Sequence, residues 1–440
     1  MIISRRRNIY TICFIAVIFT CAASYRLPGM AAMAASDTSK LTGQSQAGDD
    51  DVFFETLFKQ YPGVFDSVLA HRRDWNVQII YTEVNRNNNN IPTTKSYYFN
   101  RAGARYFYPA SSIKLPVALL ALQRLQELKA SGIEKFSTMI TEPVGPGLSG
   151  VYNEPNSTDG IPNIASYIKK ILLVSDNDAY NRLYEFLGQE YINRQLKAKQ
   201  YESGLVMHRL EISLTDSQNR VTNPIDFYRN GRLMLHQPTQ LNKVNYPQRS
   251  DSMGKGYYAN GKLVNKAMDF STKNRLSLHD LHSMLMGLIL PGQLPASKQF
   301  SISEEDRAFV LKYMSAFPRE SMYPSYDTAN YPDAGSKFIL YGGEKGNKPA
   351  NLRIFSKSGQ AYGQLVDAAY VVDLDKNIEF MVSAAIYCNA DGILNDDVYE
   401  YESIGLPFMK NLGKALYDRE LKRKRNQVPD LSGFRFSYDK

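Results

Sequence analysis

The chain has 440 residues, of which 43% are hydrophobic and 22% charged, so it can bury the core of one large domain or of two smaller ones. The formal net charge is +8, but four of the 52 lysines and arginines lie in the first 35 residues, and the remaining 48 exceed the 44 acidic residues by only 4. This mild charge comes without a basic stripe interleaved with aromatic residues, so we expect no nucleic-acid partner.

Residues 1–35 have the pattern of a secretory signal peptide. Three arginines precede an apolar run over residues 9–23, and Ala32-Met33-Ala34 fits an A-x-A cleavage site. A flexible polar arm, residues 36–51, is expected next. The sequence therefore predicts an exported, periplasmic protein. Two alternatives stay open: lipidation at Cys21, and an uncleaved anchor, for which the apolar run is short.

The cysteine and histidine content argues against a metal enzyme. Cys13 and Cys21 lie in the leader, so only Cys388 remains after processing and no internal disulfide is possible. The chain has five histidines and neither a C-x-x-C nor an H-E-x-x-H pattern. We therefore expect no metal and no cofactor.

Hydrophobic periodicity predicts strands near both ends of the chain and helices between them. In chain order we expect a helix at 53–69, strands at 76–84 and 95–100, helices at 111–129, 164–173, 179–187, 276–290 and 304–317, strands at 350–356, 364–373 and 378–387, and a helix at 402–425.

This order predicts an α/β fold of the α+β kind, in which an antiparallel sheet is formed from both chain ends and flanked by helices. The catalytic domain is expected over residues 52–425, with an all-helical lobe inserted over about 109–330. Residues 237–272, rich in Tyr, Asn, Gly and Lys, are interpreted as an insertion whose tyrosines pack. A C-terminal tail, 426–440, follows the basic run 419–425, interpreted as a solvated helix end.

Ser111-Ser112-Ile113-Lys114 is an S-x-x-K element just after Pro109. A serine that opens a helix lies at the positive end of the helix dipole, and a lysine at i+3 lies on the same helix face. A desolvated, neutral lysine can activate a serine hydroxyl as a nucleophile. Taken alone, the pattern also fits a helix-capping serine and a surface lysine.

Two more short elements follow in the order that an acyl-transfer site needs. Ser175-Asp176-Asn177 lies between two predicted helices, where a hydroxyl can pass on a proton and an amide can hold a carbonyl. Lys357-Ser358-Gly359 lies in a predicted strand, where the glycine allows a backbone to approach closely. The backbone N–H of Gln360 could join that of Ser111 as an oxyanion hole.

The set S-x-x-K, S-D-N and K-[ST]-G is the signature of class A β-lactamases and penicillin-binding proteins. Over roughly residues 52–420 the chain resembles this superfamily, and most closely the class A β-lactamase type. Phe107-Tyr108-Pro109-Ala110 before the serine and Tyr362-Gly363 after the K-S-G element add local matches.

The resemblance implies a role for each matching residue. Ser111 would be acylated, Lys114 would act as base or relay, and Ser175 would pass a proton to the leaving nitrogen. Asn177 would bind the substrate amide, while Lys357 and Ser358 would bind its carboxylate. The chain is expected to act as a monomer on a small molecule, either a β-lactam or a peptidoglycan stem peptide.

Three departures from the class A pattern bear on the reaction. The loop pattern R-x-E-x-x-L-N is matched by residues 209–215 with Glu211 as the deacylating glutamate, but Thr215 replaces the asparagine. Glu211 is thus either that catalytic residue or an ordinary surface residue. Leu365 stands where many relatives carry an arginine for the substrate carboxylate. The interval of 182 residues between Ser175 and Lys357 is long for the family.

Three functions are compatible with these residues. The first is hydrolysis of the β-lactam amide through an acyl-serine. The second is a D,D-peptidase that uses the same serine on peptidoglycan. It differs from the first in the rate at which water hydrolyses the acyl-serine ester. The third is an idle domain that binds β-lactams or muropeptides without turnover.

Overall fold

A computed structural model describes residues 47–440 except 102–104 and 146, and the expected leader lies outside these residues. Of the expected arm only the last residues are described, and they belong to the first helix, α1 (Ala47–Phe58). In the described part of the chain, no helix has the length and apolar character that a membrane span requires.

The fold is organised around an antiparallel sheet of five strands in the order β10-β11-β12-β1-β2. The pair β1–β12, with Gln78 opposite Ala385, joins the two ends of the chain, which confirms the predicted fold class. The strands are β1 (Gln78–Arg86), β2 (Pro92–Phe99), β10 (Leu352–Ala361), β11 (Gln364–Asp373) and β12 (Ile378–Tyr387).

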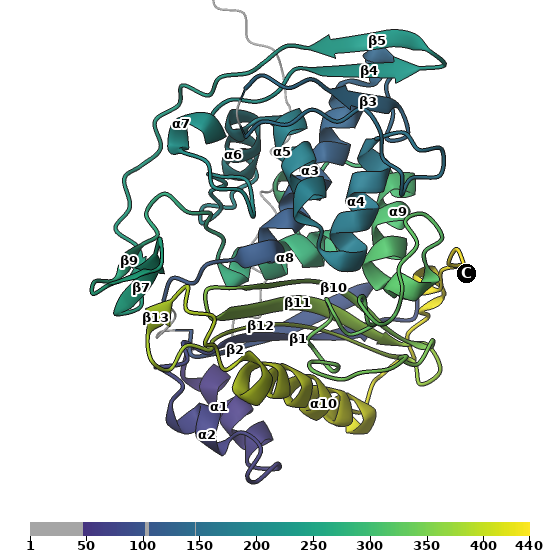
Figure 1. Cartoon of the computed structure of the whole chain (residues 1–440). Helices are drawn as coiled ribbons and strands as arrows, with labels where there is room; N and C mark the ends of the chain where they lie inside the picture. Colours follow the sequence, from purple (N-terminus) through teal and green to yellow (C-terminus); the bar gives the residue numbers. More distant parts are fainter. Residues whose placement is uncertain (1–46, 102–104, 146) are drawn as a thin grey trace, which may run out of the picture. The chain divides into compact units, whose positions relative to one another are not determined.

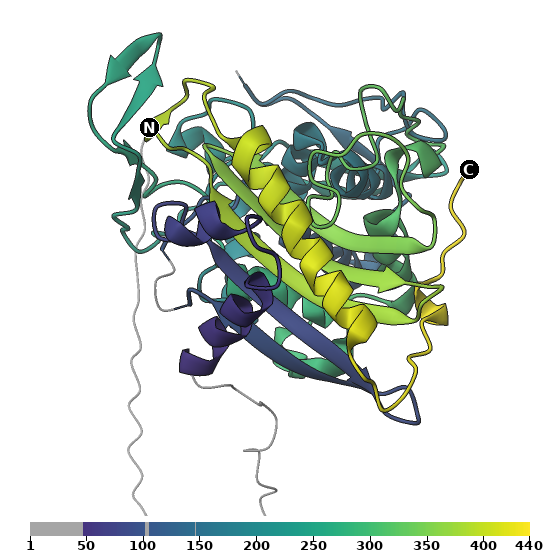
Figure 2. The same ribbon diagram turned by 90° about the horizontal axis from the view of Figure 1, so that it is seen from below.

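Helices cover both faces of the sheet, which explains why β11 is buried at every position. One face packs against α1 and α10 (Leu406–Lys422) in a single apolar cluster; Figure 2 shows α10 crossing the strands on this side. The other face packs against α8 (Leu278–Ile289) and the lobe of helices above it (Figure 1). Strands covered on both faces are nearly continuous apolar runs, so they are easily recognised in a sequence.

The lobe contains the predicted helices together with elements that periodicity missed. Helix α3 is buried along nearly its whole length, and Gly188, at φ +72°, separates α5 from an unpredicted helix, α6 (Gln189–Ala198). The lobe is not helical throughout, since it also carries a three-stranded sheet. Besides α8, its predicted helices are α3 (Lys114–Glu127), α4 (Ile164–Val174), α5 (Asn177–Leu187) and α9 (Glu304–Ser315). The small sheet consists of β3 (Thr138–Thr141), β4 (Ile225–Arg229) and β5 (Arg232–Gln237).

The segment expected as an insertion, 237–272, folds into short strands. Strand β7 (Gly256–Ala259) pairs with β8 (Lys262–Val264) and lies parallel to β13 (Ile393–Leu394), while β6 (Ser252–Met253) pairs with β9 (Met268–Asp269). The segment therefore docks on the loop that follows β12.

The tyrosines of this segment mostly pack, as expected. The hydroxyl of Tyr246 accepts a hydrogen bond from Asn242 at 3.0 Å, and Tyr257 packs in an apolar cluster with Tyr108 and Phe270. Tyr258 is 40% exposed.

Two terminal predictions need correction. The helix expected at 53–69 is two helices, α1 and α2 (Asp66–Ala70), because Gly63 adopts a left-handed φ of +80° between them. The basic run at the end of α10 is only partly solvated. Arg419, Arg423 and Arg425 all contact the carboxylate of Glu420, which is fully buried.

The last residues also pack against the domain. Leu431 and Phe434 are buried in the main core, and the aromatic ring of Phe434 lies 4.9 Å from that of Tyr370 on β11. Asp439 forms an ion pair with Lys312 of α9 at 2.9 Å. The segment 426–440 is thus ordered against the sheet and the lobe.

We predict that Glu420→Gln lowers the free energy of unfolding by about 3 kcal/mol, because half-buried guanidinium groups lose their common counter-ion. Chemical denaturation measures this. Glu304→Gln is the matched control, since Glu304 is 81% exposed in its pair with Arg307 and should change stability by less than about 0.5 kcal/mol. Equal effects of the two substitutions would contradict a structural role for the Glu420 cluster.

Candidate active site

Ser111 lies in a short 3-10 turn, Ala110–Ile113, that leads directly into α3 at Lys114. The sequence placed the serine at the start of the helix, and the structure places it one turn earlier. Ala110 has a φ of +46°, which is unfavourable for a residue with a side chain and marks strain next to the serine. Ser111 borders a cleft of about 500 Å³.

Lys114 has no exposed surface, although it carries an amine. Its Nζ donates to the carbonyl oxygen of Ser175, to Oδ1 of Asn177 at 2.5 Å and to Oγ of Ser175 at 3.3 Å. The S-x-x-K and S-D-N elements, more than 60 residues apart in the chain, are therefore in direct contact.

The S-D-N element forms the junction between α4 and α5. Ser175 ends α4 with a left-handed φ of +60°, and the carboxylate of Asp176 caps α5 by accepting from the N–H of Ala179 at 2.7 Å. Within this element the helix-capping role therefore belongs to Asp176. Ser175 and Asn177 on either side of it are free to face Lys114.

Lys357 brings the third element to the same hydroxyl. Its Nζ donates to Oγ of Ser175 at 2.9 Å and to the carbonyl of Ser358 at 2.8 Å. The hydroxyl of Ser175 therefore lies between the amines of Lys114 and Lys357. A hydroxyl in this position can pass a proton from one neighbour to another.

Both lysines are deeply buried, and burial shifts their protonation equilibria toward the neutral form. Burial lowers the pKa of Lys114 well below its usual value, the charge of Lys357 lowers it further, and Asp176 and Glu211 oppose this shift. Burial lowers the pKa of Lys357 to about 7, although the charge of Asp367 acts in the opposite direction. An amine with a pKa near 7, such as that of Lys357, can exchange protons near neutral pH.

Gly359 is in close contact with the backbone around the serine. A Cβ at this position would lie 2.7 Å from the carbonyl oxygen of Pro109 and 2.8 Å from the backbone nitrogens of Ser111 and Ser112. Any side chain would therefore push strand β10 away from the turn.

Gln360 presents its backbone toward the same turn. Tyr362 and Gly363 both have positive φ values in the two-residue turn between β10 and β11, so Ala361 and Gln364 form the hydrogen-bonded pair next to the turn. In an antiparallel ladder the next pair, which contains Gln360, directs its N–H and C=O away from the neighbouring strand. Gln360 and Ser111 border the same cleft, as a two-donor oxyanion site requires.

The surroundings of the predicted binding residue Ser358, and of Leu365 at the position where the family's arginine is replaced, limit what each can offer a ligand. The hydroxyl of Ser358 donates to the carbonyl of Ser336 at 2.8 Å, so only its lone pairs remain for a ligand. Leu365 is fully buried in the core, so this position supplies no group to the cleft.

Glu211 is exposed, borders the cleft and accepts a hydrogen bond from Nδ2 of Asn177 at 2.7 Å. It has a left-handed φ of +65°. Thr215, by contrast, caps the short helix α7 (Asp216–Asn219), and its hydroxyl accepts from the N–H of Gln218 at 3.2 Å. The side chain that replaces the family's asparagine is thus occupied within its own loop.

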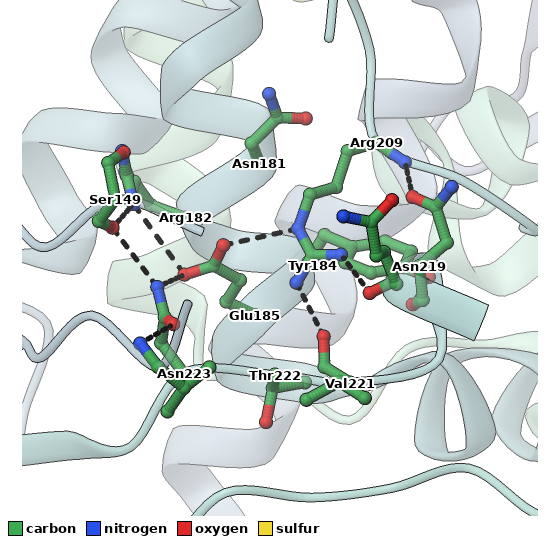
Figure 3. Close-up of polar contacts among 12 residues, drawn as sticks. Ser149, Asn181, Arg182, Tyr184, Glu185, Arg209, Asn219, Val221, Thr222 and Asn223 are labelled. Atoms are coloured by element: carbon green, nitrogen blue, oxygen red, sulfur yellow. Dashed lines mark hydrogen bonds and ion pairs between the residues drawn. The ribbon is translucent and has the colours of Figure 1, made fainter. Parts of the chain in front are cut away.

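The loop that carries Glu211 is closed at its base by a buried ion pair that sequence analysis did not find (Figure 3). Arg209 pairs with Glu185 of α5 at 3.1 Å and donates to the carbonyl of Val221 at 2.7 Å, so one side chain joins both ends of the loop. The arginine was recognised from the loop pattern, but its partner lies on a helix 24 residues away and has no local signal.

A pair of hydrogen bonds with Asn181 also holds the loop directly beside Glu211. The side chain of Asn181 accepts from the N–H of Leu210 at 2.8 Å and donates to its carbonyl at 2.9 Å. Asn181 lies one turn after Asn177 on α5. The same helix therefore positions both the amide that contacts Glu211 and the backbone that precedes it.

A model of the β-lactamase enzyme family matches residues 66–419. The chain belongs to this family. Its structure is similar to β-lactamases from Sphaerobacter thermophilus (12% identity, 80% of this chain and 94% of that chain covered, TM-score 0.44) and Desulfarculus baarsii (14%, 83% and 98%, 0.44). It is also similar to an ancestral class A β-lactamase (13%, 82% and 99%, 0.44). No curated protein matches the sequence.

We predict that Glu185→Gln leaves the buried charge of Arg209 uncompensated and loosens the loop. Hydrogen exchange of the loop amides, measured by mass spectrometry, should accelerate on the order of 100-fold, which reflects about 3 kcal/mol of lost local stability. Glu190→Gln on the neighbouring helix is the control, because Glu190 and its partner Arg194 are both about half exposed or more. Unchanged exchange in the Glu185 variant would show that the ion pair does not hold the loop.

Proposed function

We propose that the chain is a serine hydrolase that opens the β-lactam amide through an acyl-enzyme on Ser111. The observation that carries this proposal is Lys114, a buried amine with a strongly lowered pKa. It lies at i+3 from the serine and is hydrogen-bonded to both functional residues of the S-D-N element.

In the proposed acylation, Ser111 Oγ loses its proton to neutral Lys114 and attacks the β-lactam carbonyl carbon. The developing oxyanion is stabilised by the backbone N–H groups of Ser111 and Gln360. As the C–N bond breaks, the hydroxyl of Ser175 gives its proton to the leaving nitrogen and is reprotonated from the neighbouring amines of Lys114 or Lys357. The hydrogen bonds of both lysines to Ser175 support this route.

Substrate binding is proposed to use the remaining residues. Asn177 would donate to the amide carbonyl of the acyl side chain, and protonated Lys357 with Ser358 would bind the ring carboxylate. Gly359 has no side chain, so the substrate backbone can approach β10 closely. The turn at Ser111 already makes such a close contact with this residue.

In the proposed deacylation, Glu211 accepts a proton from water, which attacks the ester and releases Ser111. The support is that Glu211 and Ser111 border the same cleft and that Glu211 is bonded to Asn177. Thr215 cannot help to hold this water while its hydroxyl caps α7.

The engagement of Thr215 favours a second candidate, in which the acyl-enzyme is long-lived towards β-lactams and the natural substrate is a peptidoglycan stem peptide. A D,D-peptidase needs the same acylating residues but not a rapid hydrolytic water. For either substrate we propose that the protein acts in the periplasm, after export by its N-terminal signal.

The deciding experiment is hydrolysis of a chromogenic cephalosporin by the wild type, Ser111→Ala and Glu211→Gln, with intact-mass spectrometry of each mixture. We expect wild-type turnover, a loss of at least about 10³-fold in Ser111→Ala, and a single accumulating acyl adduct in Glu211→Gln. A stable adduct on the wild type without turnover would indicate the peptidase instead. Absence of any adduct would indicate an idle domain.

The pKa of Lys357 gives a pH prediction. Above pH about 7 this amine loses its proton and its attraction for the substrate carboxylate, so kcat/KM should fall about tenfold per pH unit there. Lys357→Arg is the control, because a guanidinium stays protonated and should move the alkaline limb to higher pH even if its fit lowers the maximum. An unchanged alkaline limb in this variant would assign it to another group.

A further inference from the structure

The cleft next to Ser111 extends toward the loop 208–213 and to Lys273, which follows the inserted strands. Among its lining residues the charged side chains are those of Arg209, Glu211 and Lys273. His208 also lines it, but burial lowers the pKa of this imidazole to about 4 and the nearby charge of Lys273 lowers it too, so it is neutral.

Of these three side chains, Lys273 alone has neither an ion-pair nor a hydrogen-bond partner within the described chain. Arg209 is paired with Glu185, and Glu211 is hydrogen-bonded to Asn177. The ammonium of Lys273 makes no ion pair or hydrogen bond with any described residue, although its side chain is partly buried and burial lowers its pKa. A cation that is partly desolvated and unpaired gains more from an anionic ligand than an exposed one does.

The neighbouring residues His208 and Asp216 do not supply a counter-charge for this ammonium. The ring of His208 stacks on Tyr108, at 6.2 Å between centroids and 5° between planes, so it is fixed beside the lysine as an uncharged surface. Asp216 lines a smaller adjoining pocket of about 130 Å³ together with Lys273, but its carboxylate pairs with Arg220 at 2.9 Å.

The inserted segment fixes the position of Lys273. The N–H of Lys273 donates to the carbonyl of Phe270 at 3.0 Å, and its carbonyl accepts from Arg249 at 2.8 Å. The ring of Phe270 packs on Tyr108 and Tyr362, at 5.7 and 5.3 Å between centroids, and both tyrosines border the cleft. The segment 249–273 is therefore joined to the wall of the active site.

We propose that Lys273 forms a cationic subsite that selects substrates whose acyl side chain carries a carboxylate. This rests on the proposed function, which places the leaving nitrogen at Ser175 and the ring carboxylate at Lys357. The acyl side chain then extends between Gln360 and Asn177 in the opposite direction, along the part of the cleft that ends at Lys273. The subsite is thus distinct from the one that binds the ring carboxylate.

The test compares two penicillins that differ by one group, benzylpenicillin and its α-carboxybenzyl analogue, in the wild type, Lys273→Met and Lys273→Arg. We expect Lys273→Met to lower the second-order acylation constant for the carboxylate compound on the order of 10-fold and to leave benzylpenicillin within about twofold. Lys273→Arg should retain the preference, and added salt should weaken it. Lys262→Met, an exposed lysine on β8, is the control and should change neither substrate.

The outcomes separate this inference from the function on which it rests. Equal losses for both penicillins, or none for either, would overturn the subsite while the acylation of Ser111 stands. No acyl adduct with either compound in any protein would overturn the proposed function and the subsite together. Thermal unfolding of Lys273→Met shows whether it is folded, and Lys273→Arg keeps the comparison valid if it is not.

Discussion

The site depends on the contact between the edge of strand β10 and the turn that precedes α3. Gly359 lies so close to Pro109 and Ser111 that a single added carbon would collide with their backbone atoms. This contact joins the C-terminal part of the sheet to the first helix of the lobe. It also brings Lys357 to the hydroxyl of Ser175 and the free edge of Gln360 to the serine, so the site exists only when sheet and lobe are assembled.

The pKa values of the lysines in and near the site depend on whether their hydrogen-bond partners are charged or neutral. Lys170 of the lobe is also largely buried, with 12% of its side chain exposed, but Asp176 and Glu154 outweigh the effect of burial and raise its pKa. Lys114 and Lys357 donate instead to neutral oxygens of Ser175, Asn177 and Ser358, so burial prevails and their pKa values fall. Neutral hydrogen-bond acceptors satisfy an amine without fixing its charge, which is the condition for proton transfer.

The sequence was sufficient to predict the strands of the sheet and most helices, because these depend on local periodicity. The grouping of the three motifs into one site followed only from the resemblance to the family. Helix α6 and the hairpin β4–β5 were missed, since both lie in segments with many polar residues. The partner of Arg209 and the role of Arg419 and its neighbours could not be predicted, because each depends on a carboxylate placed by tertiary packing. The same holds for Lys273, which nothing in its local sequence distinguishes from an ordinary surface lysine.

The residues proposed for acylation and the residue proposed for deacylation lie in parts of the chain that are held in different ways. The residues proposed for acylation lie on the turn before α3, on α3 itself, at the α4–α5 junction and on β10, elements that pack against each other throughout the core. Glu211 lies on an exposed loop that is anchored to α5 by the ion pair of Arg209 and by the hydrogen bonds of Asn181. Thr215 caps α7 within that loop, and Glu211 borders the cleft together with Asn177. Under the proposed function, a change at Thr215 would therefore alter the lifetime of an acyl-enzyme without altering its formation, and this separation would let one scaffold serve either hydrolysis of β-lactams or slow release of a peptide.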